Sequence, residues 1–164
     1  MPTVKKHLQI FLSHSSDTKE HVKVIGEVIN NINTTLDNYH LDLFEHKSDT
    51  TPGAGHPQKV IFDQCPVNTW DIYIALLWHR FGFPLTYEGK KYESGVEVEF
   101  EKAYELWESS GGKKPKILFY QSNIPIHPKD VDPKQLEKVY KSNAKIYYSS
   151  YEGLEELKTK LIEI

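Results

Sequence analysis

The chain carries at its centre the stretch Asp71-Ile72-Tyr73-Ile74-Ala75-Leu76-Leu77-Trp78. Its apolar residues follow one another without polar alternation, so we expect a strand that is covered on both faces, as in a parallel sheet between helices. On either side of it, short apolar runs alternate with longer periodic segments, which is typical of repeated βα units. The sequence therefore predicts an α/β fold in which helices flank a central parallel sheet.

Periodicity and turn residues predict where the other elements lie. We expect five strands, at residues 8–12, 41–44, 71–78, 116–120 and 144–148. Three helix starts are marked by capping residues, Asp17 with Glu20, Asp132 with Pro133, and Ser149 with Glu152. Further helices are expected near residues 58–65 and around residue 99. The stretches 45–57, 80–93 and 121–131 are expected to be irregular, and loops of such length are often functional.

Length and composition restrict the class of protein. A chain of 164 residues with 38% hydrophobic content fits one domain with a sizeable core. There are 20 basic and 23 acidic residues, with no basic cluster along one face, so nucleic-acid binding is not expected. The longest apolar run is too short for a bilayer and the N-terminus lacks a signal-peptide segment, which predicts a cytoplasmic protein without membrane contact. The single cysteine, Cys65, excludes an internal disulfide and is expected to pack against a helix.

Several common kinds of site find no support in the residue spacing. None of the eight histidines forms a close pair with zinc-type spacing, and His40 and His46 straddle a strand, so no metal is expected. The glycines Gly53 and Gly55 do not follow the dinucleotide fingerprint, and the chain has no phosphate-binding loop with its lysine. A Ser-His-Asp triad is not expected either, because the chain has no nucleophile elbow.

The helix that opens with Ser94-Gly95 carries the strongest candidate for chemistry. Its predicted apolar stripe consists of Val96, Phe100, Ala103, Tyr104 and Trp107. Glu99 falls at the edge of this stripe, between core and solvent, where a carboxylate near the helix N-terminus reaches a ligand. Glu97 borders the other flank and is a competing candidate. The plain alternative for both is a half-solvated acid that favours the positive end of the helix.

Ligands of open parallel sheets bind outside the carboxyl ends of the strands. Four segments are expected to meet there: the turn after Leu12, the loop after Phe44, the loop after Trp78 and the start of the Glu99 helix. They supply the candidate substrate-binding residues Ser13, His14, Glu45, Gly53, Gly55, Trp78, Arg80 and Phe81. Turn formation, packing under a loop and a surface salt bridge are the structural alternatives for these side chains.

Four motifs occur in an order and spacing that a known family shares. They are Ile10-Phe11-Leu12-Ser13-His14-Ser15-Ser16-Asp17, Pro52-Gly53-Ala54-Gly55, Trp78-His79-Arg80-Phe81-Gly82 and Glu99-Phe100-Glu101-Lys102-Ala103. In these motifs the chain resembles the Toll/interleukin-1 receptor (TIR) domains, and particularly the bacterial TIR-like domains of antiphage defence proteins. Enzymatic members often have an aromatic residue four positions before the catalytic glutamate, where this chain has Gly95, and Trp78 or Phe81 is expected to replace it.

The resemblance implies a flavodoxin-like three-layer fold with a five-stranded parallel sheet. It further implies an NAD+ glycohydrolase that needs no bound cofactor, with Glu99 as the catalytic residue. Trp78 and Phe81 are then expected to stack on nicotinamide or adenine, Arg80 to pair with the pyrophosphate, and Ser13 and His14 to donate to phosphate or ribose.

Residues 1–164 are expected to form one TIR-like domain, the N-terminal effector of a larger protein that is fused to a sensor or oligomerising domain and activated by self-association. Two other functions stay open. In an enzyme similar to nucleoside deoxyribosyltransferases, Glu99 attacks a sugar carbon as a nucleophile. In a non-enzymatic TIR scaffold, the loop at residues 52–55 binds a second copy and Glu99 is a surface acid.

Overall fold

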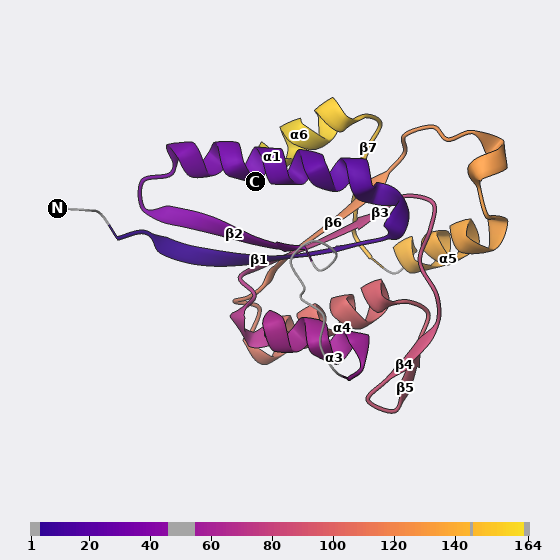
Figure 1. Ribbon diagram of the computed structural model, residues 1–164, viewed down its shortest axis with the longest axis horizontal. Coiled ribbons are helices and arrows are strands. Elements are labelled where there is room, and N and C mark those ends of the chain that lie inside the picture. The colour runs from indigo at the N-terminus through magenta and orange to yellow at the C-terminus, as the bar shows by residue number, and fades with distance from the viewer. Residues whose placement is uncertain (1–3, 46–54, 145, 163–164) are drawn as a thin grey trace.

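The computed structural model describes residues 4–45, 55–144 and 146–162. Its sheet contains β1 (Lys6–His14), β2 (Tyr39–Glu45), β3 (Ile72–Leu77), β6 (Lys116–Ser122) and β7 (Ser149–Tyr151). The five strands are all parallel, in the order β2-β1-β3-β6-β7 (Figure 1). This order and the flanking helices confirm the predicted flavodoxin-like α/β fold.

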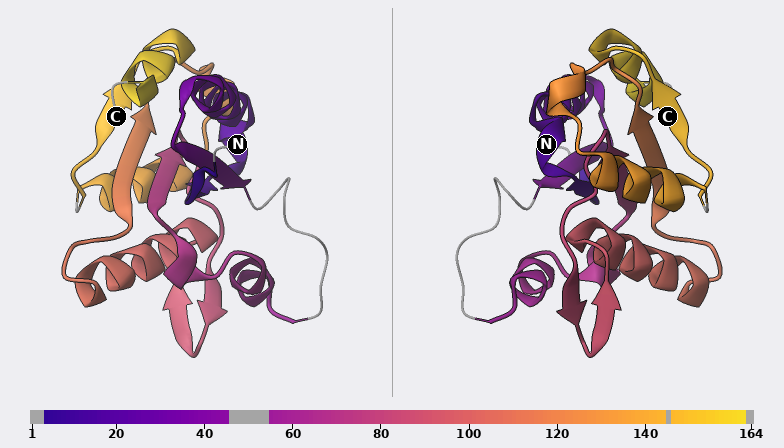
Figure 2. Two further views of the ribbon diagram at one scale, coloured as in Figure 1. Left: turned by 90° about the vertical axis from the view of Figure 1, so that its left-hand side faces the viewer. Right: turned by 90° about the vertical axis from the view of Figure 1, so that its right-hand side faces the viewer.

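Helices cover both faces of the sheet. Among the described residues they are α1 (Lys19–Thr35), α3 (Pro57–Gln64), α4 (Gly95–Ser109), α5 (Pro133–Asn143) and α6 (Leu154–Ile162), with short 3₁₀ turns at Ser16–Thr18, Val67–Thr69 and Pro128–Asp130. Helices α1 and α6 lie on one face, and α3 and α4 lie on the other (Figure 2). No helix among the described residues is both long and apolar enough to cross a membrane.

The central strand β3 separates two apolar cores. Ile74 and Leu76 face the core under α1 and α6, whereas Tyr73, Ala75 and Leu77 belong to the core that α3, α4 and α5 cover. All five side chains are buried. The uninterrupted apolar run of this strand therefore reflects its position between two helical layers, as predicted.

A β-hairpin lies within residues 80–93, which were expected to be irregular. Its strands are β4 (Leu85–Tyr87) and β5 (Lys90–Tyr92), joined by a two-residue turn in which Glu88 and Gly89 both have positive φ, 50° and 77°. Positive φ at both turn residues suits the right-handed twist of a tight hairpin. The prediction missed this hairpin although glycine at the turn was a signal for it.

The last strand and its cap differ from the prediction. Residues 144–148 were expected to form the fifth strand, but β7 begins at Ser149, which pairs with Tyr120 of β6. Ser149 therefore cannot cap the last helix. The N–H of Glu152 is instead bonded by the carboxylate of Glu156, at 2.9 Å. By contrast, Asp132 caps α5 as predicted, with Pro133 in the first turn.

Candidate functional site

Glu99 lies in the second turn of α4 and is 1% exposed. The hydroxyl of Ser13, at the end of β1, donates a 2.6 Å hydrogen bond to its Oε1. The side-chain amide of Gln58, in the first turn of α3, donates to its Oε2 at 3.3 Å. Glu99 was expected at the border of the core, and that prediction was wrong because β1 and α3 close over the carboxylate.

The buried stripe of α4 is also rotated from the predicted one. Its buried residues are Val96, Val98, Glu99 and Ala103, whereas Tyr104 and Trp107 are about two-fifths exposed, 44% and 40%. The reason is the hairpin, because Tyr87 and Tyr92 pack on Val98 and bury a flank of the helix that periodicity assigned to solvent. Glu99, next to Val98 in the helix, is therefore buried as well.

Tyr73 adds a second polar group beside the carboxylate. Burial raises the pKa of the Tyr73 phenol well above its ordinary value, the charge of Glu99 raises it further, and the Ser13 hydroxyl opposes the shift. The phenol therefore stays neutral at physiological pH. Its surroundings identify a dry environment, in which the electrostatic effect of a carboxylate on a ligand is strong.

A pocket of about 220 Å³ opens next to Glu99. Its lining residues come from the end of β1 and the turn after it, from α3, from the loop after β3 and from the first turns of α4. They are His14, Ser15, Ser16, Gln58, Phe81, Gly82, Phe83, Gly95, Val96 and Glu99. This volume is below the range of about 300–1,000 Å³ that holds a drug-sized ligand, and it suits one ring or sugar of a larger molecule.

Two glycines allow the backbone segments around this pocket to come close. Gly82 has φ of +110°, and a Cβ there would lie 3.0 Å from the Cβ of Ser94. A Cβ on Gly95 would lie 3.2 Å from the amide oxygen of Gln58. An aromatic residue at position 95 would therefore displace Gln58, and the aromatic rings that line the pocket come from Phe81 and Phe83 instead.

The start of α3 is tied to the hairpin, and this places Gln58. Nδ1 of His56 accepts the backbone N–H of Gln58 at 3.1 Å. With Nδ1 as acceptor, Nε2 is the donor, and it lies 2.8 Å from the carbonyl oxygen of Thr86 in β4. The imidazole thus caps the helix and fixes the backbone from which the Gln58 side chain reaches Glu99.

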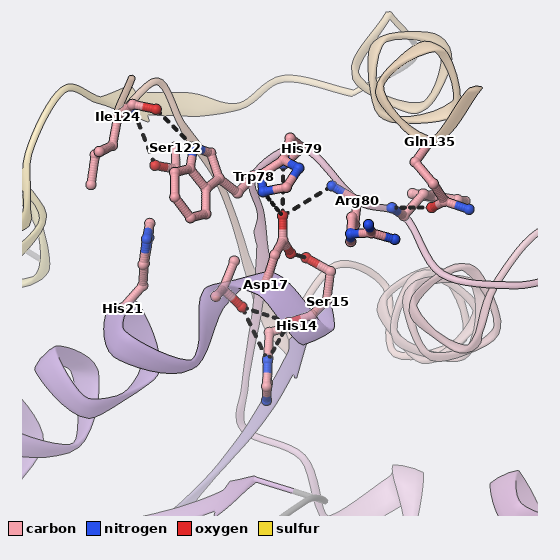
Figure 3. A network of polar contacts seen from close by, with 12 residues as sticks. His14, Ser15, Asp17, His21, Trp78, His79, Arg80, Ser122, Ile124 and Gln135 are labelled. Carbon is pink, nitrogen blue, oxygen red and sulfur yellow. Dashed lines mark hydrogen bonds and ion pairs between the residues drawn. The ribbon is translucent and has the colours of Figure 1, made fainter. Parts of the chain in front are cut away.

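The loop after β3 is held from two sides (Figure 3). Asp17 Oδ2 accepts the backbone N–H groups of His79 and Arg80, at 2.9 and 3.0 Å. Asp17 was predicted to form a capping box with Glu20. This was wrong: neither the 3₁₀ turn nor α1 has a side-chain cap, because the Asp17 carboxylate is bonded to this loop and to Ser15.

On the other side, the side chain of Gln135 in α5 holds the next two residues of that loop. Its Oε1 accepts the N–H groups of Phe81 and Gly82 at 2.8 and 2.9 Å, and its Nε2 donates to the Gly82 carbonyl at 2.8 Å. The pocket wall at Phe81 and Gly82 is therefore a fixed backbone element.

His14 links the pocket to the second strand. Its Nε2 lies 2.5 Å from Oε1 of Glu45, and both side chains are buried. Its Nδ1 lies 2.9 Å from the Ser15 carbonyl oxygen and 3.1 Å from the Thr18 hydroxyl. His14 lines the pocket, and Glu45 joins the site through this imidazole.

The predicted residues Trp78, Arg80 and Gly55 do not line the Glu99 pocket. Trp78 donates from Nε1 to the Ile124 carbonyl at 2.8 Å and its ring lies beside those of His21 and His79 (Figure 3). Neither Trp78 nor Arg80 belongs to the lining of this pocket. Gly55 is exposed, with φ of +111°, and Gly53 lies outside the described residues.

The competing candidate Glu97 has a local role. Its carboxylate accepts the backbone N–H of Glu93 at 3.1 Å, and its own N–H donates to the Ser94 hydroxyl at 3.3 Å. Both bonds stabilise the first turn of α4. Glu97 lines a different pocket from Glu99, so the geometry favours Glu99 as the functional carboxylate.

Gln58, Tyr73 and Gln135 are site residues that the sequence did not reveal. Tyr73 had a usable signal, because strand alternation places it on the face of β3 that α4 covers. The sequence held no such signal for the two glutamines, because each reaches the site only through the packing of its helix against other segments.

Comparison of the chain with models of known protein families finds no match. Comparison with the curated proteins finds none either.

Proposed function

We propose that the protein is an NAD+ glycohydrolase of the TIR class, which breaks the bond between nicotinamide and ribose. The observation that carries this proposal is the buried carboxylate of Glu99, which lines a pocket at the carboxyl edge of the sheet between the neutral donors Ser13 and Gln58. Burying a carboxylate is costly, so its position is better explained by a ligand than by stability. The resemblance to TIR domains supports the same residue.

In this reaction the electron pair of the glycosidic bond leaves with nicotinamide, and positive charge develops on the ribosyl carbon and ring oxygen. The Glu99 carboxylate stabilises that charge and holds the ribose hydroxyls, an effect that is strong in a dry pocket. Water then adds to the ribosyl carbon and releases a proton, which yields ADP-ribose. Addition of the adenine instead gives a cyclic product.

The pocket volume of about 220 Å³ fits nicotinamide with part of its ribose. We expect His14, Phe81 and Gly82, which line this pocket, to contact that end of the substrate. The adenine end would extend beyond this pocket. We further propose that self-association activates the enzyme and that it serves as an effector in bacterial antiphage defence, which the family resemblance supports.

The test is the release of nicotinamide from NAD+, measured by chromatography at high protein concentration with a crowding agent. We expect Glu99→Gln to lower the rate at least about a hundredfold. Glu97→Gln is the matched control, two residues away on the same helix, and is expected to keep the activity. Loss of activity in Glu97→Gln alone would move the site to Glu97.

Absence of nicotinamide release by the assembled wild-type protein would overturn the proposal. In that case, exchange of a base between a nucleoside and a free acceptor base would identify a transferase. Absence of both reactions would leave the non-enzymatic TIR scaffold as the remaining function.

A further inference from the structure

Two imidazoles and a carboxylate meet at the amino ends of β1 and β2, where the strands begin on the left of Figure 1. Nδ1 of His7 lies 2.8 Å from Oδ2 of Asp42, and Nδ1 of His40 lies 3.0 Å from Oδ1 of the same carboxylate. The two imidazole rings are 5.1 Å apart. One potential ligand atom from each of the three residues lies within 4.8 Å of the others.

Strand pairing brings these residues together. His7 lies opposite His40 in the parallel register of β1 and β2, and Asp42 follows two residues later on the same face. Leu41 and Leu43 pack into the core with α1, so His40 and Asp42 point to the other face of the sheet. No pair of zinc-type spacing is visible along the chain, because these two histidines become neighbours only through the sheet.

We propose that His7, His40 and Asp42 form a binding site for a divalent transition metal of the Zn²⁺ type. Two imidazole nitrogens and one carboxylate oxygen are the ligands of known three-residue zinc sites, which keep a fourth position open. Ligand atoms of a tetrahedral zinc site lie about 3.3 Å apart, given bonds of about 2.0–2.1 Å. Here the imidazole nitrogens lie 2.8 and 3.0 Å from the two different oxygens of Asp42, and one donor atom from each residue lies within 4.8 Å of the others. Rotation of the partly exposed side chains is therefore needed to bring three donor atoms to this spacing around one ion.

The protons of the three groups balance in a simple way. Each neutral imidazole binds the metal through Nδ1 and carries its proton on Nε2, and the carboxylate binds in its ionised form. Metal binding therefore transfers any proton on Nδ1 to Nε2 or releases it to solvent. Metal affinity is therefore expected to fall in acid.

The position of the cluster suits a site that an ion enters from solvent. The side chains are partly exposed, 61% for His7 and 40% each for His40 and Asp42. Strand β2 is at the edge of the sheet, so the open fourth position takes water or a donor from another molecule. The cluster lies at the opposite end of β1 from Ser13 and Glu99, so this inference is independent of the proposed function.

The experiment uses the chain without a polyhistidine tag, titrated with Zn²⁺ by calorimetry and with Co²⁺ by visible absorption. We expect one metal ion per chain and Co²⁺ bands typical of four- or five-fold coordination. His40→Ala is expected to abolish these bands, and Asp42→Asn to weaken binding at least about tenfold, since even outer-shell groups cost 10–100-fold.

The matched control is His127→Asn, which removes an exposed imidazole elsewhere and keeps a side chain able to cap the turn at Lys129. It is expected to bind metal like the wild type. Circular dichroism of each metal-free variant checks that it is folded. The proposal is overturned by the absence of saturable binding, or by binding that His40→Ala leaves unchanged.

Discussion

The hydroxyl of Ser13 donates a 2.6 Å hydrogen bond to Oε1 of Glu99 and thereby joins the end of β1 to the second turn of α4. The donor and the acceptor are both buried. Hydrogen bonds to ionised groups are shorter and stronger than neutral ones, so this contact holds the carboxylate in one orientation. Because the two elements pack on each other, the carboxylate is oriented before a ligand arrives.

Replacing Ser13 by alanine removes a donor to a buried carboxylate. We expect Ser13→Ala to lower the free energy of unfolding by about 1–3 kcal/mol, because Oε1 of Glu99 then loses a buried hydrogen bond. The turnover number for nicotinamide release should fall about tenfold, since each 1.4 kcal/mol of lost transition-state stabilisation is tenfold in rate. Urea unfolding and steady-state kinetics measure the two effects. The control is Ser109→Ala, which removes an exposed hydroxyl near the end of α4; equal losses in both variants would contradict a specific role for Ser13.

Gln58 offers a comparison between losing a donor and adding a charge. Gln58→Leu removes the amide that donates to Oε2 of Glu99, whereas Gln58→Glu places a second carboxyl group about where that amide lies, 3.3 Å away. Like charges in a buried site repel, so Gln58→Glu should be the less stable and less active variant at neutral pH. Thermal unfolding and nicotinamide release measure this order. The reverse order would mean that Gln58 does not face the ionised carboxylate.

The central strand and the layered architecture were predictable because local pattern determines them. A run that is apolar on both faces requires cover on both sides. In β3, Ile74 and Leu76 are buried in one core and Tyr73, Ala75 and Leu77 in the other. The start of α5 was equally local, since Asp132 caps its own helix.

The site was less predictable because distant segments complete it. Helical periodicity alone placed Glu99 at the border of the core. Its burial depends on the hairpin that packs on Val98 and on the amide of Gln58. Asp17 also had a plausible local role as a cap, but its carboxylate accepts the N–H groups of His79 and Arg80 in the loop after the neighbouring strand β3. Such competition between local and distant partners is invisible in the sequence.

The carboxylate of Asp17 anchors the loop that forms one wall of the pocket. Asp17→Asn keeps the size of the side chain but replaces one oxygen by an N–H₂ group and removes the charge. We expect it to lower the free energy of unfolding by about 1–3 kcal/mol and to speed hydrogen exchange at the amides of His79 and Arg80. Urea unfolding and exchange followed by NMR measure this. The control is Asp37→Asn, which changes an exposed acid just after α1. Unchanged exchange in Asp17→Asn would show that the loop does not depend on this anchor.

The turn of the hairpin holds a residue in a costly conformation. Glu88 has φ of 50° and is followed by Gly89, with φ of 77°. Asparagine tolerates positive φ better than glutamate, and Asn-Gly is the preferred pair for this turn. We expect Glu88→Asn to raise the free energy of unfolding by up to about 1 kcal/mol, measured in urea.

That substitution also removes the 3.1 Å ion pair between Glu88 and Lys102. Exposed pairs contribute little, so this loss should not cancel the gain. Glu88→Gln is the control, because it removes the same charge and keeps the unfavourable backbone requirement. If Glu88→Gln were stabilised as much as Glu88→Asn, the backbone conformation would not be the cause.

His21 is expected to make the stability of the fold depend on pH. Its imidazole is buried, its Nδ1 lies 2.5 Å from the Tyr151 hydroxyl, and its ring lies 4.9 Å from that of Trp78. Burial lowers the pKa of His21 from its ordinary value of 6.5, and the charges of Asp17 and Glu20 oppose this shift only in part. In the unfolded chain the imidazole therefore takes up a proton at a higher pH than in the folded protein. As the pH falls through 6.5, protonation stabilises the unfolded chain and the free energy of unfolding decreases. The decrease ends below the lowered pKa, where both states are protonated.

Urea unfolding between pH 8 and pH 5 should show a smaller decrease for His21→Gln, which has no titrating group but keeps a polar partner for Tyr151. Parallel curves for the two proteins would contradict the assignment.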